Sequence, residues 1–421
     1  MLTVVGGCYR EACLRPGWRQ LYGSGVRAVA AARPLLPEPP TLVTAAAEDE
    51  ARSLARMAAT YDFRIRLHHR PSRIEFQYDH PLAPPRLHPD LGDIGHTPPV
   101  EVDADTVLTF SLIEATTRVT AKTLVYDPQA GRRAIPPSAA NARAERLAIV
   151  ANLGEVRAML TVRTGQRPPA EARLAELGER LRGLETAAVV VVKDGVRGAA
   201  VVTGDGVVPV PAFMTPSVFP VGSGDVFSAV FAALWAVRGM TAADAARLAS
   251  VVTARYCHTQ DLTTPADPAT LFSLYDAGPI EPPGQQPQLR PVYLAGPFWT
   301  LPQLWLVSEA RRCLTDQGLE VFSPAHDVGV LGDDPTAEDV RRVATADLAG
   351  LDGAAAVLAL LDGLDAGTLF EIGHARSRGI PVVGLAEAVP RTAITMLEGT
   401  GCFLTADFTT AIYLTGWEAR R

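Results

Sequence analysis

Three acidic residues near the C-terminus have the types and the spacing that glycosidic chemistry needs. Asp347 and Asp365 flank an apolar run at 354–361, and Glu371 follows in the first turn of a predicted helix. Ligands of open parallel sheets bind at the carboxyl ends of the strands. A carboxylate that attacks an electron-poor carbon, with a second acid that protonates the leaving group, can break a glycosidic bond. The spacing also allows an alternative, in which Glu371 caps its own helix and the aspartates are solvated in a loop.

A second group of residues has the types that phosphate chemistry needs. Gly222, Ser223 and Gly224 precede a predicted amphipathic helix, and Asp225 lies at its start. Backbone N–H groups of a glycine turn at a helix N-terminus bind anions. An aspartate at the same point can take a proton from a hydroxyl that attacks a phosphate. The alternative is an ordinary glycine turn with an aspartate near the helix start.

Short apolar strands alternate with longer amphipathic segments along most of the chain. Examples are "TLVTAA" (41–46), "AAVVVVKDG" (187–195) and "AAAVLALLDG" (354–363). This alternation predicts an α/β protein whose parallel sheets are covered by helices. Residues 62–100 interrupt the rhythm, which predicts a small antiparallel lid outside the main sheet.

One segment is unsuited to any packed core. Residues 276–290 are rich in Pro, Gly and Gln and hold few large apolar side chains. Such a composition is typical of a linker. We therefore predict one domain over 1–275, a linker over 276–290 and a second domain over 291–421.

Composition restricts the classes of function. The chain has 421 residues, of which 48% are hydrophobic and 20% charged, so it can build sizeable cores. The net charge of −7 argues against nucleic-acid binding, which normally needs a basic face. No apolar run reaches the roughly 18 residues of a membrane span, and the N-terminus has no signal-peptide pattern. Five scattered cysteines form no disulfide framework, so we expect a cytoplasmic protein with no membrane partner.

The C-terminal segments occur together in a known order. They are "YLAGPF" (293–298), "VFSPAHDVG" (321–329) and "DLAGLDGAAAVLALLDGLDAGTLFEIGHARSRGIPVV" (347–383). Together they resemble the nucleoside 2-deoxyribosyltransferase family. The resemblance implies a doubly wound, flavodoxin- or Rossmann-like domain that needs no cofactor. It also implies cleavage of an N-glycosidic bond, with the sugar passed either to another base or to water.

The same resemblance implies roles for individual residues. Glu371 is the nucleophile that attacks C1′ of a nucleoside and forms a covalent glycosyl-enzyme. Tyr293 orients this nucleophile, Asp365 is the acid near the base, and Asp347 matches a second family aspartate.

Three further residues are candidates for substrate binding. Gly296 and Phe298 follow the first strand, and Phe298 either stacks on a nucleobase or caps the core. Gly367 lets the backbone approach a ligand closely. This part of the chain has no asparagine with which to complete the pocket, so the sequence leaves open whether nucleosides or nucleotides are preferred.

The N-terminal segments also occur together in a known order. "VYDPQ" (125–129), "VANLGEVRAML" (150–160) and "VVVVKDGVRGAAVV" (189–202) precede the glycine turn at 222–225. Together they resemble the ribokinase-like (PfkB) sugar and nucleoside kinases. The resemblance implies a parallel-sheet domain with a small lid that uses ATP and Mg²⁺ and has Asp225 as its base.

The kinase resemblance assigns four more residues. Asn152 and Glu155 organise Mg²⁺ and phosphate without binding the metal directly, and Lys193 and Gly195 lie on the nucleotide side. The acceptor end departs from the family pattern, because Arg27 stands where an asparagine is expected.

The sequence thus predicts a bifunctional enzyme of nucleoside or nucleotide metabolism. One domain cleaves or transfers an N-glycosidic bond, and the other phosphorylates a sugar or nucleoside with ATP. In the alternative, the kinase-like domain is a nucleotide-sensing or oligomerisation module without turnover. Both resemblances imply a homodimer or higher homo-oligomer that binds small molecules.

Overall fold

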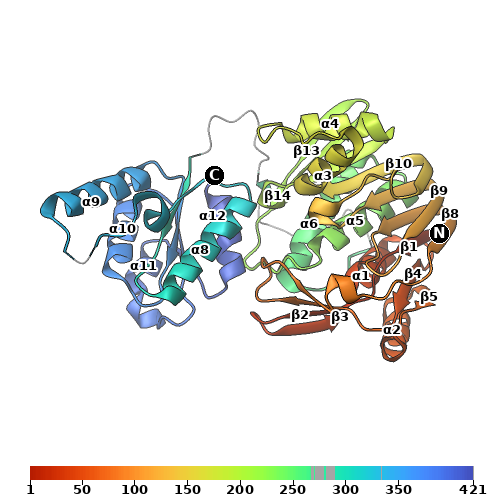
Figure 1. The fold of residues 1–421 in the computed structure, drawn as a ribbon, viewed down its shortest axis with the longest axis horizontal. Coiled ribbons are helices and arrows are strands. Elements are labelled where there is room, and N and C mark those ends of the chain that lie inside the picture. The colour runs from red at the N-terminus through yellow and green to blue at the C-terminus, as the bar shows by residue number, and fades with distance from the viewer. Residues whose placement is uncertain (267–269, 271–278, 281–289, 333, 421) are drawn as a thin grey trace. The chain divides into compact units, whose positions relative to one another are not determined.

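The computed structural model describes residues 1–266, 270, 279–280, 290–332 and 334–420 (Figure 1). Contacts divide the chain into two compact units. The N-terminal unit comprises Met1–Thr215 and Phe219–Pro282, and the C-terminal unit comprises Pro283–Arg421 together with Pro216–Val218. Of the linker predicted over 276–290, all but 279–280 and 290 lie outside the described residues.

The N-terminal unit is built on a nine-stranded sheet of order β13-β12-β11-β10-β9-β8-β1-β4-β5 (Figure 1). Neighbouring strands pair in parallel, except that β12 pairs antiparallel with both β11 and β13 at one edge. The strands are β1 (Leu2–Val5), β4 (Thr41–Ala46), β5 (Arg64–His69), β8 (Val100–Phe110), β9 (Thr117–Asp127), β10 (Ala142–Asn152), β11 (Val189–Lys193), β12 (Ala199–Thr203) and β13 (Gly206–Val210). The helices are α1 (Gly23–Ala32), α2 (Glu48–Tyr61), α3 (Leu153–Thr164), α4 (Leu174–Glu185), α5 (Ser223–Phe231) and α6 (Ala242–Thr259). A separate short pair joins β14 (Ala212–Phe213) to β15 (Pro279–Ile280).

Apolar side chains cover both faces of this sheet, as parallel sheets require. Val190 and Val192 of β11 share a buried cluster with Leu160 of α3 and Leu181 of α4. Val191 points to the opposite face, because side chains alternate along a strand, and it is also fully buried. Helices α1, α5 and α6 pack on one another, and α1 and α6 also contact strands of the sheet.

The edge strand β13 carries a proline. Pro209 pairs with Ala200 of β12, and Val207 and Val208 of the same edge strand are exposed. Proline is confined to edge strands because its nitrogen has no hydrogen to donate.

The lid is a four-stranded sheet of order β3-β2-β6-β7. Its strands are β2 (Arg10–Cys13), β3 (Trp18–Leu21), β6 (Glu75–Tyr78) and β7 (Arg86–His88). The prediction that the lid spans 62–100 was wrong in two respects. Residues 64–69 form β5 of the main sheet, and half of the lid comes from 10–21, because β2 pairs in parallel with β6.

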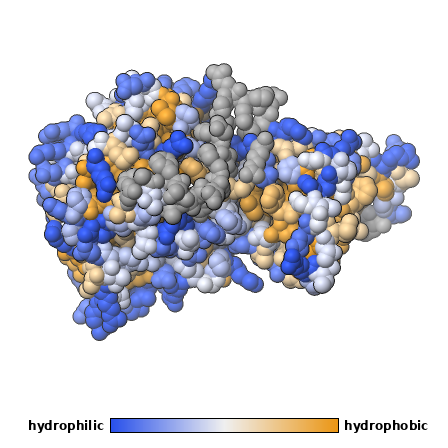
Figure 2. Space-filling view, turned by 180° about the vertical axis from the view of Figure 1, so that it is seen from behind, coloured by the Kyte–Doolittle hydropathy of each residue, from blue (hydrophilic) through white to orange (hydrophobic). Residues whose placement is uncertain are grey.

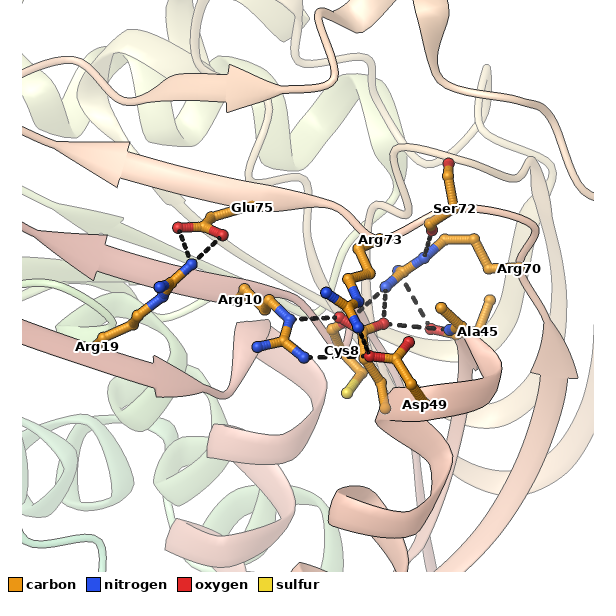
Figure 3. Close-up of polar contacts among 11 residues, drawn as sticks. Cys8, Arg10, Arg19, Ala45, Asp49, Arg70, Ser72, Arg73 and Glu75 are labelled. Atoms are coloured by element: carbon orange, nitrogen blue, oxygen red, sulfur yellow. Dashed lines mark hydrogen bonds and ion pairs between the residues drawn. The ribbon is translucent and has the colours of Figure 1, made fainter.

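Buried charges fix the lid where it joins the main sheet. Arg70 is 1% exposed and pairs with Glu50 at 2.6 Å and with Glu114 at 3.0 Å. It also donates to the carbonyls of Cys8, Ala45 and Ser72, and Figure 3 shows these groups around its guanidinium. Removing one partner of such a buried set leaves an uncompensated charge, so these residues stabilise the base of the lid only as a group.

The C-terminal unit has a five-stranded, all-parallel sheet of order β17-β16-β18-β19-β20. The strand that follows β16 in the chain, β17, lies on one side of β16, and the later strands lie on the other side. The strand order therefore reverses between β16 and β18, which is the usual ligand-binding position of a doubly wound sheet. The strands are β16 (Val292–Ala295), β17 (Val321–Phe322), β18 (Ala356–Leu360), β19 (Val382–Leu385) and β20 (Phe403–Thr405). The helices are α8 (Leu301–Asp316), α9 (Ala337–Asp352), α10 (Ala366–Ser377), α11 (Thr395–Gly399) and α12 (Phe408–Glu418). The predicted α/β fold, with a lidded parallel sheet and a smaller doubly wound sheet, is confirmed.

Candidate active sites in the two units

In the C-terminal unit, a tyrosine and a glutamate form a direct contact beside the switch between β16 and β18. The Tyr293 hydroxyl donates to Oε1 of Glu371 at 2.7 Å. Tyr293 is fully buried in β16, whereas Glu371 lies in the second turn of α10 rather than the predicted first turn. The difference arises because Asp365, not Glu371, is the residue that caps α10. The rigid tyrosine holds one carboxylate oxygen in a fixed direction.

The surroundings of Glu371 favour its protonated form. Burial raises the pKa of Glu371 to about 7, and the nearby carboxylates of Asp347 and Asp365 act in the same direction. The Tyr293 hydroxyl opposes this rise in the pKa, because it donates a hydrogen bond to the ionised form. A carboxylate poised near neutral pH is typical of functional sites.

Asp347 lies within α9 rather than in a loop before the strand. Burial raises its pKa, and its Oδ1 is buried without a hydrogen-bond partner among the described residues. A buried acceptor without a partner is costly in a folded protein. Asp347 can therefore accept a hydrogen bond from a ligand hydroxyl.

Asp365 is already engaged by its own helix and by the neighbouring loop. Its Oδ2 accepts the Thr368 N–H at 2.9 Å, and its Oδ1 accepts the Trp299 indole N–H at 3.1 Å. Although burial acts to raise the pKa of Asp365, these hydrogen bonds hold it below the usual value. Near neutral pH Asp365 is thus an ionised acceptor of hydrogen bonds, which is a poor state for the predicted proton donor.

The other predicted C-terminal residues lie close to these acids. Phe298 is half-buried against the exposed ring of Trp299, with 4.7 Å between ring centroids. Gly367 is exposed in the first turn of α10, where an added Cβ would lie 3.0 Å from Asp365 Oδ2. At Gly296 an added Cβ would lie 2.9 Å from the Cβ of Leu360, so close packing between β16 and β18 explains this glycine without a ligand.

In the N-terminal unit, a cleft of about 980 Å³ runs beneath the lid. It brings together Asp225, Glu155 and Lys193, which lie far apart in the sequence. Asn152, Gly222 and Gly224 also line it, whereas, within the described part of the chain, Ser223 and Gly195 do not.

Asn152 and Glu155 form two hydrogen bonds with each other at the start of α3. The Glu155 N–H donates to Asn152 Oδ1, and the Asn152 N–H donates to Glu155 Oε2, both at 2.9 Å. This reciprocal pair is a capping box, so the spacing has a structural cause as well as a possible functional one. Burial raises the pKa of Glu155 to about 6, and the carboxylate of Asp127 adds to this effect.

Asp127 is a cleft residue that sequence reasoning did not single out. It ends β9 within the quoted "VYDPQ", and an acid at the carboxyl end of an apolar strand was the available signal. Its Oδ2 accepts Lys193 Nζ at 2.9 Å and Ser228 Oγ at 2.6 Å. Its buried Oδ1 has no hydrogen-bond partner among the described residues. Carboxylate oxygens are the ligands that Mg²⁺ prefers, so Asp127 and Glu155 fit the cation that the kinase resemblance implies.

Asp225, the predicted base, carries a salt bridge of its own. Its Oδ2 accepts Arg27 Nη1 at 2.6 Å, and its Oδ1 accepts a hydrogen bond from the Gln129 amide. Gly222, which begins the glycine turn, has a left-handed φ of 82°. An added Cβ there would lie 2.1 Å from Arg27 Nε, so the turn requires glycine for both reasons.

Comparison with known protein families separates the same two regions. Residues 110–268 match the pfkB family carbohydrate kinase model, and residues 292–404 match the nucleoside 2-deoxyribosyltransferase model. The two matches follow one another in this order along the chain. Both family resemblances noted in the sequence are therefore confirmed. No curated protein sequence matches the chain.

Three solved structures that are similar to the chain cover about two thirds of it. Ribokinase from Thermotoga maritima is 14% identical, with a TM-score of 0.46 over 65% of this chain and 99% of its own. A Burkholderia thailandensis nucleoside kinase in complex with inosine is 15% identical, with a TM-score of 0.47 over 66% of this chain and 99% of its own. Ribokinase from Giardia lamblia is 14% identical, with a TM-score of 0.47 over 65% of this chain and 99% of its own.

None of the helices in the described residues is long and apolar enough to span a membrane.

Proposed function

We propose that the C-terminal unit cleaves or transfers the N-glycosidic bond of a nucleoside or nucleotide through Glu371. The observation that carries this proposal is the 2.7 Å hydrogen bond by which the buried Tyr293 aims the Glu371 carboxylate. The family match over residues 292–404 supports the substrate class.

The proposed chemistry has two steps. The free carboxylate oxygen of Glu371 attacks C1′, the bond from C1′ to the base nitrogen breaks, the departing base takes a proton from solvent, and a glycosyl ester forms on Glu371. A second base or a water molecule then attacks C1′, gives its proton to solvent, and releases the Glu371 carboxylate. In this proposal the buried, unpaired oxygen of Asp347 accepts a hydrogen bond from a sugar hydroxyl. Ionised Asp365 accepts a hydrogen bond from an N–H of the base.

Chromatography tests this proposal directly. The purified full chain is incubated with a panel of nucleosides and their 5′-monophosphates, with and without an acceptor base. We expect free base or exchanged nucleoside from the wild type, and a loss of at least about 1,000-fold in Glu371→Gln. Glu338→Gln, an exposed glutamate on α9, is the matched control and should retain activity. Base release that persists in Glu371→Gln would rule out the glutamate mechanism.

For the N-terminal unit we propose binding of ATP with Mg²⁺ in the cleft beneath the lid. The start of α5 with Gly222 and Gly224 offers N–H groups to phosphate, and Asp127 and Glu155 would hold the cation. Bound ATP would supply a transferable phosphoryl group. The sequence predicted transfer of this group with Asp225 as base, and its alternative was binding without turnover. The salt bridge between Arg27 and Asp225 favours the alternative.

We also propose a homodimer or higher homo-oligomer. Hydrophobic residues gather on the C-terminal unit on the face that Figure 2 shows. Leu301 and Trp305 of α8 and Phe370 of α10 are each more than half exposed. Such exposed apolar side chains often mark interaction surfaces. Light scattering during size-exclusion chromatography would give the mass, and a mass equal to one chain would contradict this proposal.

A further inference from the structure

Three charged side chains meet at the glycine-turn end of the N-terminal cleft. Arg27 of α1 pairs with Asp225 of α5 at 2.6 Å and donates through two nitrogens to both carboxylate oxygens of Glu11 of β2. All three side chains are at least nine-tenths buried. We call Glu11, Arg27 and Asp225 the acid–arginine–acid triad. It links the lid, through β2, to the helix that follows the glycine turn.

Aromatic residues enclose the guanidinium of Arg27. Its Nε donates to the Tyr256 hydroxyl at 3.1 Å, and that hydroxyl donates to the Val221 carbonyl at 2.7 Å. The Tyr22 ring lies 5.3 Å from the guanidinium carbon. Arg27 is 1% exposed as a result, so this contact is not a surface ion pair that solvent would weaken.

The position of Arg27 conflicts with phosphoryl transfer in two ways. First, the guanidinium lies directly over Gly222, as the 2.1 Å approach to an added Cβ shows, and it fills space beside the glycine turn. Second, both oxygens of Asp225 accept hydrogen bonds from the chain's own side chains, Arg27 and Gln129. A general base must lie within hydrogen-bond reach of the hydroxyl whose proton it takes. An acceptor hydroxyl that reaches Asp225 would have to compete with buried Arg27 at Oδ2 or with Gln129 at Oδ1.

Within the described part of the chain, Arg27 forms no hydrogen bond or ion pair with three other charged residues of the cleft, which are Asp127, Glu155 and Lys193. Lys193 lies beside Gly224, where an added Cβ would be 3.4 Å from its Nζ, and one buried oxygen of Asp127 has no partner among the described residues. Gly224, Lys193, Asp127 and Glu155 are thus available to phosphate and Mg²⁺, whereas Asp225, the base that an acceptor hydroxyl needs, is already paired.

We infer that Arg27 is the specificity-determining residue that closes the acceptor end, so that the N-terminal unit retains a nucleotide without transferring phosphate to a sugar or nucleoside hydroxyl. This inference rests on the proposed binding of ATP. Removing the arginine together with its lid partner should open the acceptor end. The acceptor oxygen would then form a bond to the γ-phosphorus, the bond from that phosphorus to the β–γ bridging oxygen would break, and ADP would leave. The hydroxyl proton would pass to Asp225 and then to solvent.

The test uses the full chain as wild type, Asp225→Asn, and the double variant Glu11→Gln with Arg27→Asn. Equilibrium dialysis with labelled ATP and Mg²⁺ measures binding, and chromatography measures ADP formed with a panel of pentoses, hexoses and nucleosides. We expect wild type to bind ATP and to form ADP no faster than Asp225→Asn. The double variant should bind ATP and form ADP at least about tenfold faster with one or more acceptors.

Each outcome bears on a different claim. ADP formation by wild type that Asp225→Asn abolishes would overturn the role of Arg27, and this comparison does not depend on the folding of the double variant. A double variant that melts within a few degrees of wild type and binds ATP, but gains no ADP formation, would also overturn it. Failure of wild type to bind ATP would instead overturn the proposed function on which the inference rests.

Discussion

At the scale of single residues, the ionisation of Glu371 controls the proposed chemistry. Only the ionised carboxylate can attack C1′, and its pKa in the free protein is about 7. We therefore expect kcat/KM for base release to rise about tenfold per pH unit below pH 7 and to level off above it. Initial rates between pH 5 and 9 check this expectation. A profile that is flat from pH 5 to 7 would exclude Glu371 as the titrating nucleophile.

Tyr293 should set the pH at which kcat/KM stops rising, which is the acidic limb of the pH profile. Its hydroxyl lowers the pKa of Glu371 by donating to the ionised form, so Tyr293→Phe should move the limb to higher pH. The rate on the alkaline plateau should also fall, by about 10- to 100-fold, because the carboxylate loses its orientation. If the residue only filled space, Phe would preserve both the limb and the plateau.

The same ionisation predicts a change in stability. The folded-state pKa of Glu371 is raised from 4.5 to about 7, so ionisation destabilises the fold. Below pH 4.5 the group is protonated in both states and contributes no difference. Glu371→Gln should therefore match wild type near pH 4.5 and exceed it by about 1–3 kcal/mol above pH 7. Urea denaturation at both pH values measures the free energy of unfolding, and an advantage confined to acidic pH would contradict the assignment.

Motifs predicted residues that act through local sequence and missed those that act through distant contacts. Asn152 and Glu155 were predicted from the spacing of a motif in the kinase resemblance, and the capping box that they form gives this spacing a local cause. The capping role of Asp365 was also readable, since aspartate is a favoured residue just before the first turn of a helix. Arg27 appeared in the sequence only as a departure from a pattern. Its contact with Asp225 joins residues 198 positions apart, and no local rule specifies such a pair.

At the scale of elements, Arg70 is the residue on which the base of the lid depends most. Arg70→Met should leave Glu50 and Glu114 buried without their partner and lower the free energy of unfolding of the N-terminal unit by about 3–5 kcal/mol. The matched control is Arg19→Gln, which removes an ion pair between lid strands that Figure 3 shows. Arg19 is 65% exposed, so its loss should cost about 0–1 kcal/mol. Equal costs for the two variants would contradict the role of burial.

The alternation of elements was predictable, but the membership of the lid was not. Apolar runs identified strands such as β11 and β18, because strands buried on both faces must be apolar throughout. β2 and β3 have polar sequences and short lengths, and β2 pairs with β6, which is distant in the sequence. Pairing of this kind depends on tertiary contacts rather than on local pattern.

At the scale of the whole molecule, two units with separate cores should respond separately to their ligands. We expect calorimetry to record two unfolding transitions, and ATP with Mg²⁺ to raise only one of them. Binding at 100 times Kd adds about 2.7 kcal/mol to the unit that binds. A Glu371→Gln substitution should shift the other transition. A single transition that both changes move would show that the units unfold as one.

The proline of the edge strand β13 has a consequence for protein at high concentration. Exposed Val207 and Val208 would otherwise make this edge a template for another β-strand, and unprotected edges of this kind recruit neighbouring molecules into aggregates. Pro209 removes one donor from that edge and interrupts any continuous ladder of hydrogen bonds. Replacing Pro209 with valine should therefore leave both proposed activities unchanged and make the protein aggregate faster in concentrated solution.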